Sequence, residues 1–195
     1  MRRIAALLSG IVLLGSYGNE RIMAEPRTDV QRPSVAAKSA SIEALGPEAQ
    51  KDLAILREST KHLRDFETAR DFGGWSVMIT GCMDDPAAGG MGFQYGNPKL
   101  IDGSVRVDTP ELLLYEPEKN GRLRLVGVEY VVPLSEWKSA TPPRLFGRDF
   151  EVNAAFQIWA LHVWVWEHNP NGMFADWNPR VTCDYTSNVS AITHS

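Results

Sequence analysis

The sequence predicts an α+β domain in which one long N-terminal helix packs on a curved antiparallel β-sheet or a small, partly open barrel, closed by one disulfide. Three observations support this prediction. Apolar side chains recur at helical spacing within residues 47–71, short apolar runs punctuated by Gly, Pro and Asn fill residues 75–167, and the chain has two cysteines. A helix followed by several turn-separated strands is typical of the α+β class.

The first element is the helix expected over residues 47–71. Pro47 suits the first helical turn, and Glu48 beside it lies at the positive end of the helix dipole. Gly73 and Gly74 are expected to end the helix. The residues that recur every three or four positions form one stripe that should pack on the sheet: Ala49, Leu53, Leu56, Thr60, Leu63 and Phe66.

Strand patterns follow the helix. We expect strands at 75–81, 111–116, 122–132 and 155–167, the second and third forming a hairpin around the PEKNG turn. The 155–167 segment is apolar on both faces, which predicts a central strand. Residues 83–92 are expected to form a Gly-rich loop, and this loop lacks the GxxxxGK spacing of a phosphate-binding loop.

The N-terminus indicates export. Two arginines precede an apolar run at 4–14, and small residues follow, with cleavage expected after Gly18 or Ala24. The run is too short to cross ~30 Å of hydrocarbon as a helix. Residues 1–24 are therefore predicted to be a signal peptide, with a periplasmic or secreted product and no membrane contact after cleavage.

Four segments are expected along the sequence: the signal peptide 1–24, a flexible leader 25–40, a single globular domain 41–185 and a frayed tail 186–195. The leader is polar and has no apolar period, so it cannot offset the entropy lost on ordering. The chain has 195 residues and a net charge of -4, which argues against a nucleic-acid partner because such proteins normally present a basic face.

Cys82 and Cys183 are the two cysteines of the chain. An isolated pair in an oxidising compartment usually bonds, and the loop closed would contain about 100 residues. Free thiols or metal ligation are the alternatives. Neither cysteine lies in a CxxC motif, so a disulfide is the leading interpretation.

Strand alternation yields a candidate polar site. If the hairpin turns around residues 117–121, Tyr115 lies opposite Leu123, and Glu111 and Glu129 then share the core-facing side of neighbouring strands. A register error of one residue would undo this assignment. Buried carboxylates are costly unless paired, so these two glutamates need a compensating partner.

His162 is the third candidate, because it is the polar side chain on one apolar face of the 155–167 strand. A lone histidine in such a core is more often structural than a ligand. Together with Glu111 and Glu129, however, its imidazole could bind a divalent metal or a polar ligand, or perform acid–base catalysis.

The six tryptophans are expected mainly in the core. Trp177 is the exception, because it lies in a turn-rich segment between two Asn-Pro steps, and we expect it to face a ligand. No GxSxG, HExxH or Cys–His nucleophile pattern is present.

Several segments together resemble an uncharacterised family of exported bacterial proteins. They are LHVWVWEHNPNGMFADWNPRVTC at 161–183, PELLLYEP at 110–117 and RLVGVEYVVP at 124–133, and the first fits the motif LHVWxWxxNPxGMFADWNPxVxC. The resemblance implies export and paired cysteines, and it implies no activity. It also implies a histidine at the position of Gln94, so Gln94 joins the candidate ligand-binding residues, and its amide would weaken a metal site.

The sequence therefore supports three functional hypotheses. The first is an exported binding protein that holds a small molecule or a metal ion in the sheet interior, near Glu111, Glu129 and His162, with Gln94 close by. The second is an enzyme that uses Glu111 and Glu129 as acid and base on a small substrate. The third is a structural or interaction domain without a ligand, which predicts no cavity beside these residues.

Overall fold

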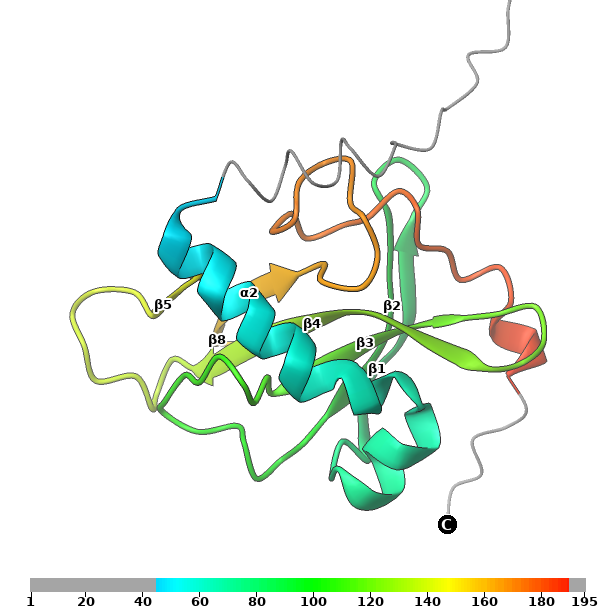
Figure 1. The fold of residues 1–195 in the computed structure, drawn as a ribbon, viewed down its shortest axis with the longest axis horizontal. Coiled ribbons are helices and arrows are strands. Elements are labelled where there is room, and N and C mark those ends of the chain that lie inside the picture. The colour runs from blue at the N-terminus through cyan, green and yellow to red at the C-terminus, as the bar shows by residue number, and fades with distance from the viewer. Residues whose placement is uncertain (1–44, 190–195) are drawn as a thin grey trace, which may run out of the picture. The chain divides into compact units, whose positions relative to one another are not determined.

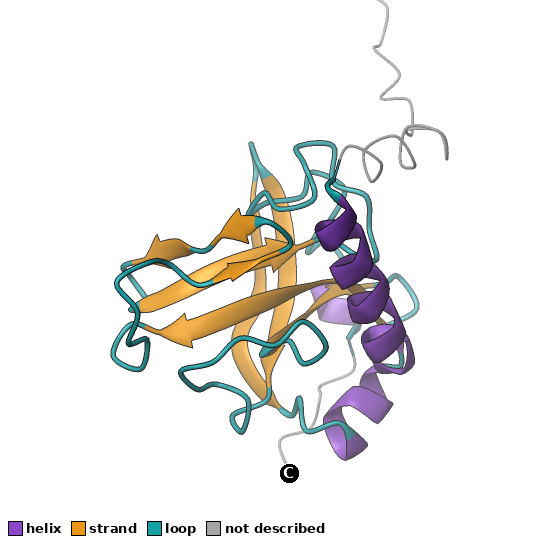
Figure 2. Cartoon of the chain, turned by 60° about the vertical axis from the view of Figure 1, so that its left-hand side comes forward, coloured by secondary structure: helices purple, strands orange, loops and turns teal. Residues whose placement is uncertain are grey.

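The structure is a computed structural model that describes residues 45–189. A six-stranded antiparallel sheet, with strand order β1-β2-β3-β4-β8-β7, curls around one side of the helix α2 (Figures 1 and 2). Its strands are β1 (Val77–Asp85), β2 (Gly89–Gly96), β3 (Leu112–Pro117), β4 (Leu123–Pro133), β7 (Glu151–Asn153) and β8 (Ile158–Val163). A separate ribbon consists of β5 (Arg144–Leu145) and β6 (Arg148–Asp149). The predicted α+β class is confirmed.

The helix α2 spans Pro47–Thr60 and is shorter than the predicted 47–71. A 3-10 turn at Lys61–Arg64 and a π turn at Thr68–Phe72 occupy the rest of that segment. Asp65 causes the interruption: its backbone is extended, and its carboxylate accepts the Thr68 N–H at 2.9 Å, which starts a new turn. The apolar spacing continued through 47–71, but the helix did not.

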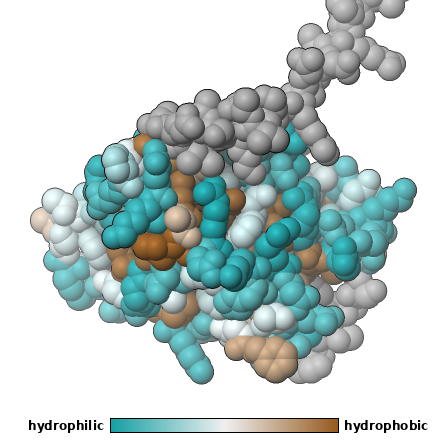
Figure 3. Space-filling model, in the orientation of Figure 1, coloured by the Kyte–Doolittle hydropathy of each residue, from teal (hydrophilic) through white to brown (hydrophobic). Residues whose placement is uncertain are grey.

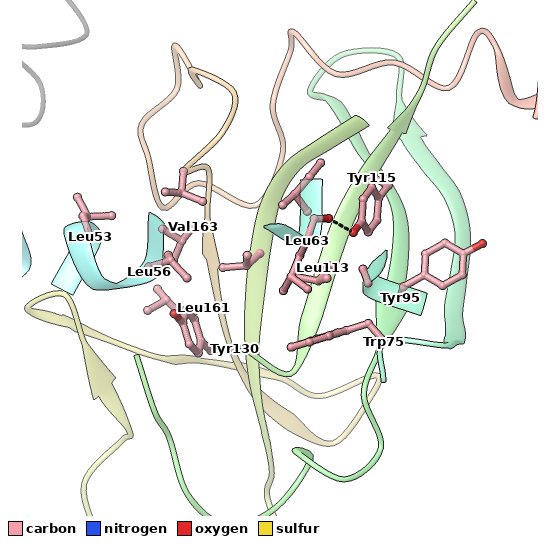
Figure 4. Close-up of a cluster of buried hydrophobic side chains, with 14 of the residues drawn as sticks. Leu53, Leu56, Leu63, Trp75, Tyr95, Leu113, Tyr115, Tyr130, Leu161 and Val163 are labelled. Carbon is pink, nitrogen blue, oxygen red and sulfur yellow. Dashed lines mark hydrogen bonds between the residues drawn. The ribbon is translucent and has the colours of Figure 1, made fainter. Parts of the chain in front are cut away.

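The main core lies between α2 and the sheet. Leu53 and Leu56 of the helix and Leu63 of the 3-10 turn are buried against residues of β3, β4 and β8 (Figure 4). The hydroxyl of Tyr115 donates to the Leu63 carbonyl at 2.5 Å, which ties the turn after α2 to β3. Burial of each such leucine contributes about 1.5–3 kcal/mol relative to an exposed side chain. On the face that carries α2, hydrophilic residues surround smaller hydrophobic patches (Figure 3).

The predicted Gly-rich loop 83–92 is wrong, because most of it belongs to the β1–β2 hairpin, which turns at 86–88. Glycine is needed there for close contacts rather than for a loop. Gly92 has φ 77°, and a Cβ at this position would lie 2.3 Å from the Tyr115 carbonyl oxygen. The glycines thus allow β2 to approach β3 closely.

The predicted β3–β4 register is also wrong. Tyr115 pairs with Leu125, not Leu123, and the register shifts between Leu114 and Tyr115, which leaves Val126 as a bulge. Beyond the bulge Leu112 pairs with Glu129, so Glu129 shares the face of Leu112. Glu111 is the residue before Leu112, and strand alternation directs it to the other face.

β8 is central in the sheet as predicted, since it pairs with β4 and β7, but it covers only Ile158–Val163 of the predicted 155–167. Residues 154–157 form the turn between β7 and β8, where Gln157 has φ 56°. β7 was not predicted, because three residues with one apolar side chain carry no strand pattern.

The C-terminal segment returns to the sheet beside β2. The backbones of Gly90 and Asn178 exchange hydrogen bonds of 3.0 and 3.1 Å. The Cys82–Cys183 disulfide, with Cα atoms 5.8 Å apart, confirms the predicted pair and attaches the segment to β1. Thr186–Asn188, which the sequence places in the frayed tail, form a 3-10 turn.

The predicted signal peptide 1–24, the leader 25–40 and residues 190–195 of the tail lie outside the described residues. Within residues 45–189, no helix is long and apolar enough to cross a membrane.

Candidate functional site

A row of polar side chains crosses the face of the sheet opposite the core under α2. Its members are Thr80, Gln94, Glu129 and His162, and we call this row the polar file. The Thr80 hydroxyl of β1 donates to Gln94 Oε1 of β2 at 3.1 Å. Gln94 Nε2 in turn donates to Glu129 Oε2 of β4 at 3.1 Å, and His162 Nε2 of β8 lies 3.5 Å from the same carboxylate oxygen. Gln94, Glu129 and His162 are all buried. The structure therefore brings three of the predicted site residues together.

His162 lies between two carboxylates. Its Nδ1 is 3.3 Å from Oδ1 of Asp176, on the opposite side of the ring from Glu129. Burial alone would lower the pKa of His162, but the Glu129 charge and the hydrogen bond to Asp176 outweigh burial and raise it. These two contacts therefore favour the protonated form of the imidazole.

The two carboxylates respond in opposite directions. Burial raises the pKa of Glu129, although the neighbouring imidazolium opposes this. The hydrogen bond from His162 lowers the pKa of Asp176, whose side chain is 63% exposed. The negatively charged form is therefore favoured at Asp176, the carboxylate that water and solutes can reach.

Asp176 is positioned by backbone contacts of the C-terminal segment. Trp164 Nε1 donates to the Ala175 carbonyl at 2.6 Å, and Asn169 Nδ2 donates to the Trp177 carbonyl at 2.9 Å. Gly89 makes the crossing possible, because a Cβ there would lie 2.3 Å from the Asn178 carbonyl oxygen. The close approach at the β1–β2 hairpin and the contacts of the Asn-Pro turns together place the Asp176 carboxylate beside His162.

A pocket of about 400 Å³ adjoins the His162 end of the polar file. Its walls come from β6, β7, β8, the C-terminal segment and Met91 of β2. The polar and charged residues that line it are Arg148, Asp149, Glu151, Asn153, His162 and Asp176. The remaining walls are mainly apolar, with Met91, Ala160 and Phe174 among them.

Glu111 does not belong to this site. It is fully buried at the start of β3, where its Oε2 accepts the Val131 N–H at 3.1 Å and its Oε1 has no hydrogen-bond partner. Burial raises the pKa of Glu111 to about 8, so the carboxyl is protonated at neutral pH. Its electrostatic neighbour Tyr130 belongs to the core under α2, away from Glu129.

Trp177 also lies apart from the pocket walls, and its contribution is the carbonyl that Asn169 holds. Sequence reasoning missed Asp176, Arg148 and Glu151. Asp176 lies between two Asn-Pro steps, and this pattern predicts a turn but does not predict which residue the Asp176 side chain contacts. Arg148 and Glu151 lie in a stretch of short strands without a recognisable pattern.

A larger hollow, of about 990 Å³, lies between residues 61–70 and 118–125 but holds none of the predicted site residues. Most of its cations are already paired. Lys61 lies 2.5 Å from Glu58, and Arg124 contacts Glu116 and, at 2.9 Å, Glu167. We therefore place the candidate site at the smaller pocket, where charge and burial coincide.

Within residues 45–189, no three His, Cys, Asp or Glu side chains are arranged to hold a metal ion. Comparison with protein-family models, with curated proteins and with solved structures finds no match to the chain. The function is therefore argued from the geometry of the pocket and its polar file.

Proposed function

We propose that this chain is an exported binding protein that holds a small molecule in the pocket over β7 and β8. The observation that carries the proposal is the end of the buried Gln94–Glu129–His162 file at a 400 Å³ pocket. Small-molecule sites are commonly cavities in which apolar walls and a few fixed polar groups meet; here six of the twelve lining residues are polar or charged.

The cavity distinguishes this function from a purely structural network. A buried ion pair rarely increases stability over apolar residues of the same size. Here one carboxylate of the cluster, Asp176, remains 63% exposed at the pocket wall. The polar file therefore fixes the Asp176 carboxylate where a ligand can reach it. Burying polar side chains to do so costs folding free energy that an apolar core would not.

Binding is favoured over acid–base catalysis. Nδ1 of His162 lies 3.3 Å from Asp176 Oδ1, and Nε2 is buried without a hydrogen-bond partner, 3.5 Å from Glu129 Oε2, so neither nitrogen is placed to take a proton from a substrate in the pocket. Glu111 and Glu129 have different partners and lie on different faces, which argues against the paired acid and base of the enzyme hypothesis.

Export is part of the proposal. Its support is the signal-like sequence of residues 1–24 together with the Cys82–Cys183 disulfide, because disulfides persist mainly in oxidising compartments.

The test is a thermal-shift screen of the mature chain with L-amino acids, amines, monosaccharides and short carboxylates. Ala160→Phe fills the pocket, and Ala87→Phe adds the same ring to the exposed β1–β2 turn as a control. We expect one class to raise the Tm of the wild type and of Ala87→Phe, but not of Ala160→Phe. A ligand at 100 times its Kd stabilises by about 2.7 kcal/mol. No response to any class, or an equal response of Ala160→Phe, would refute the proposal.

A further inference from the structure

Two charged side chains on the pocket wall have no counter-ion in the described part of the chain. Within residues 45–189 neither Arg148 nor Glu151 forms an ion pair, whereas Asp149 between them is held by Arg144 at 2.6 Å. The Arg148 guanidinium lies 5.4 Å from the centre of the Phe174 ring. This contact orients the cation without neutralising it.

The His162 cluster adds an exposed carboxylate to the pocket wall. Glu129 and Asp176 flank the imidazole ring, and Oδ1 of Asp176 faces His162. The second carboxylate oxygen of Asp176 has no hydrogen-bond partner among the described residues, and the side chain is 63% exposed. The pocket thus presents one unpaired cation and two carboxylates with free acceptor capacity.

We propose that the ligand is a zwitterion of the α-amino-acid class with an apolar side chain; this inference rests on the proposed binding function. Its ammonium group binds Asp176 and Glu151, and its carboxylate binds Arg148. Its side chain lies against Met91 and Phe174. The pocket volume of about 400 Å³ suits a molecule of this size.

Ligands of a single charge fit less well. A simple carboxylate satisfies Arg148 but places a negative group beside Asp176 and Glu151. A simple amine satisfies those carboxylates and leaves Arg148 without a counter-ion. Arg148, Glu151 and Asp176 are exposed, so a ligand that covers one of them without pairing it removes that group from water and loses binding free energy.

The test is calorimetric titration of the mature protein with L-leucine and L-phenylalanine, and with the N-acetyl and carboxamide derivatives of each. We expect at least one free amino acid to bind and both of its derivatives to bind at least 10-fold more weakly. Arg148→Gln should weaken the free amino acid but not its amide. Glu151→Gln should weaken the free amino acid but not its N-acetyl form.

The failures are distinguishable. If another class in the thermal-shift screen binds in an Ala160-dependent manner and neither amino acid does, the ligand class is wrong and the binding function stands. Equal affinity for the derivatives also refutes the zwitterion. If nothing in the screen binds, both proposals fail.

Discussion

The contact between Glu129 and His162 makes the most specific stability prediction. Glu129→Leu removes the carboxylate 3.5 Å from His162 Nε2 and leaves a buried imidazolium with Asp176 as its remaining charged partner. Breaking a buried pair in this way costs about 3–5 kcal/mol of folding free energy. For a domain of this size, each kcal/mol lowers the Tm by roughly 2–4 °C.

The double variant Glu129→Leu/His162→Leu separates pairing from packing. Gln94 keeps its hydrogen bond to Thr80 in this variant, and Asp176 keeps its contact with water. We expect the double variant to lose at least ~1 kcal/mol less than the sum of the two single variants, a coupling typical of contacting residues.

The assay is urea unfolding of the four proteins at pH 7. The exposed pair of Lys61 and Glu58 is the control, and its coupling should stay within about 1 kcal/mol. An NMR titration should find the pKa of His162 above its usual range in the wild type and lower in Glu129→Gln. Additive single variants, or an unchanged His162 pKa, would refute the account of the cluster.

Three further predictions concern the rest of the fold. Burial raises the pKa of Glu111 to about 8, so the free energy of unfolding should be highest in acid and fall by up to ~5 kcal/mol as pH rises from about 4.5 through 8. In urea unfolding, Glu111→Gln should make the free energy of unfolding depend less on pH over this range. Gly89→Ala should destabilise more than Gly172→Ala, by at least ~1 kcal/mol in thermal unfolding, because both have positive φ but only Gly89 lacks space for a Cβ. Reducing Cys82–Cys183 should cost about 4–5 kcal/mol, and the unreduced denatured protein should show no free thiol; two thiols would contradict the pairing.

The fold class could be predicted from the sequence because it depends on local periodicity. Helical spacing located α2, and the alternation and turn residues located β3 and β4 within one residue at each end. The length of the helix could not be predicted, because the apolar stripe continues past Asp65 while the side chain of Asp65 caps a new turn.

The candidate site was predicted in part. Glu129 and His162 were expected together and lie 3.5 Å apart, although the reasoning used a register without the bulge at Val126. That bulge reverses which side chains face the core, and nothing local in the sequence marks it. Glu129 was therefore assigned to the wrong side of the sheet, whereas Glu111 lies on the predicted core side with Leu113 and Tyr115. Asp176 depends on long-range docking of the C-terminal segment, which strand patterns do not encode.

The central claim is that a small molecule binds against the outer end of the His162 file. The most direct measurement is an NMR titration of the mature protein with the compound that stabilises it most in the thermal-shift screen. The imidazole signals of His162, assigned with a His162→Gln variant, are monitored during the titration. The account predicts that these signals shift with the same Kd as the stabilisation. Stabilisation without a change at His162 would place the ligand elsewhere and contradict the account.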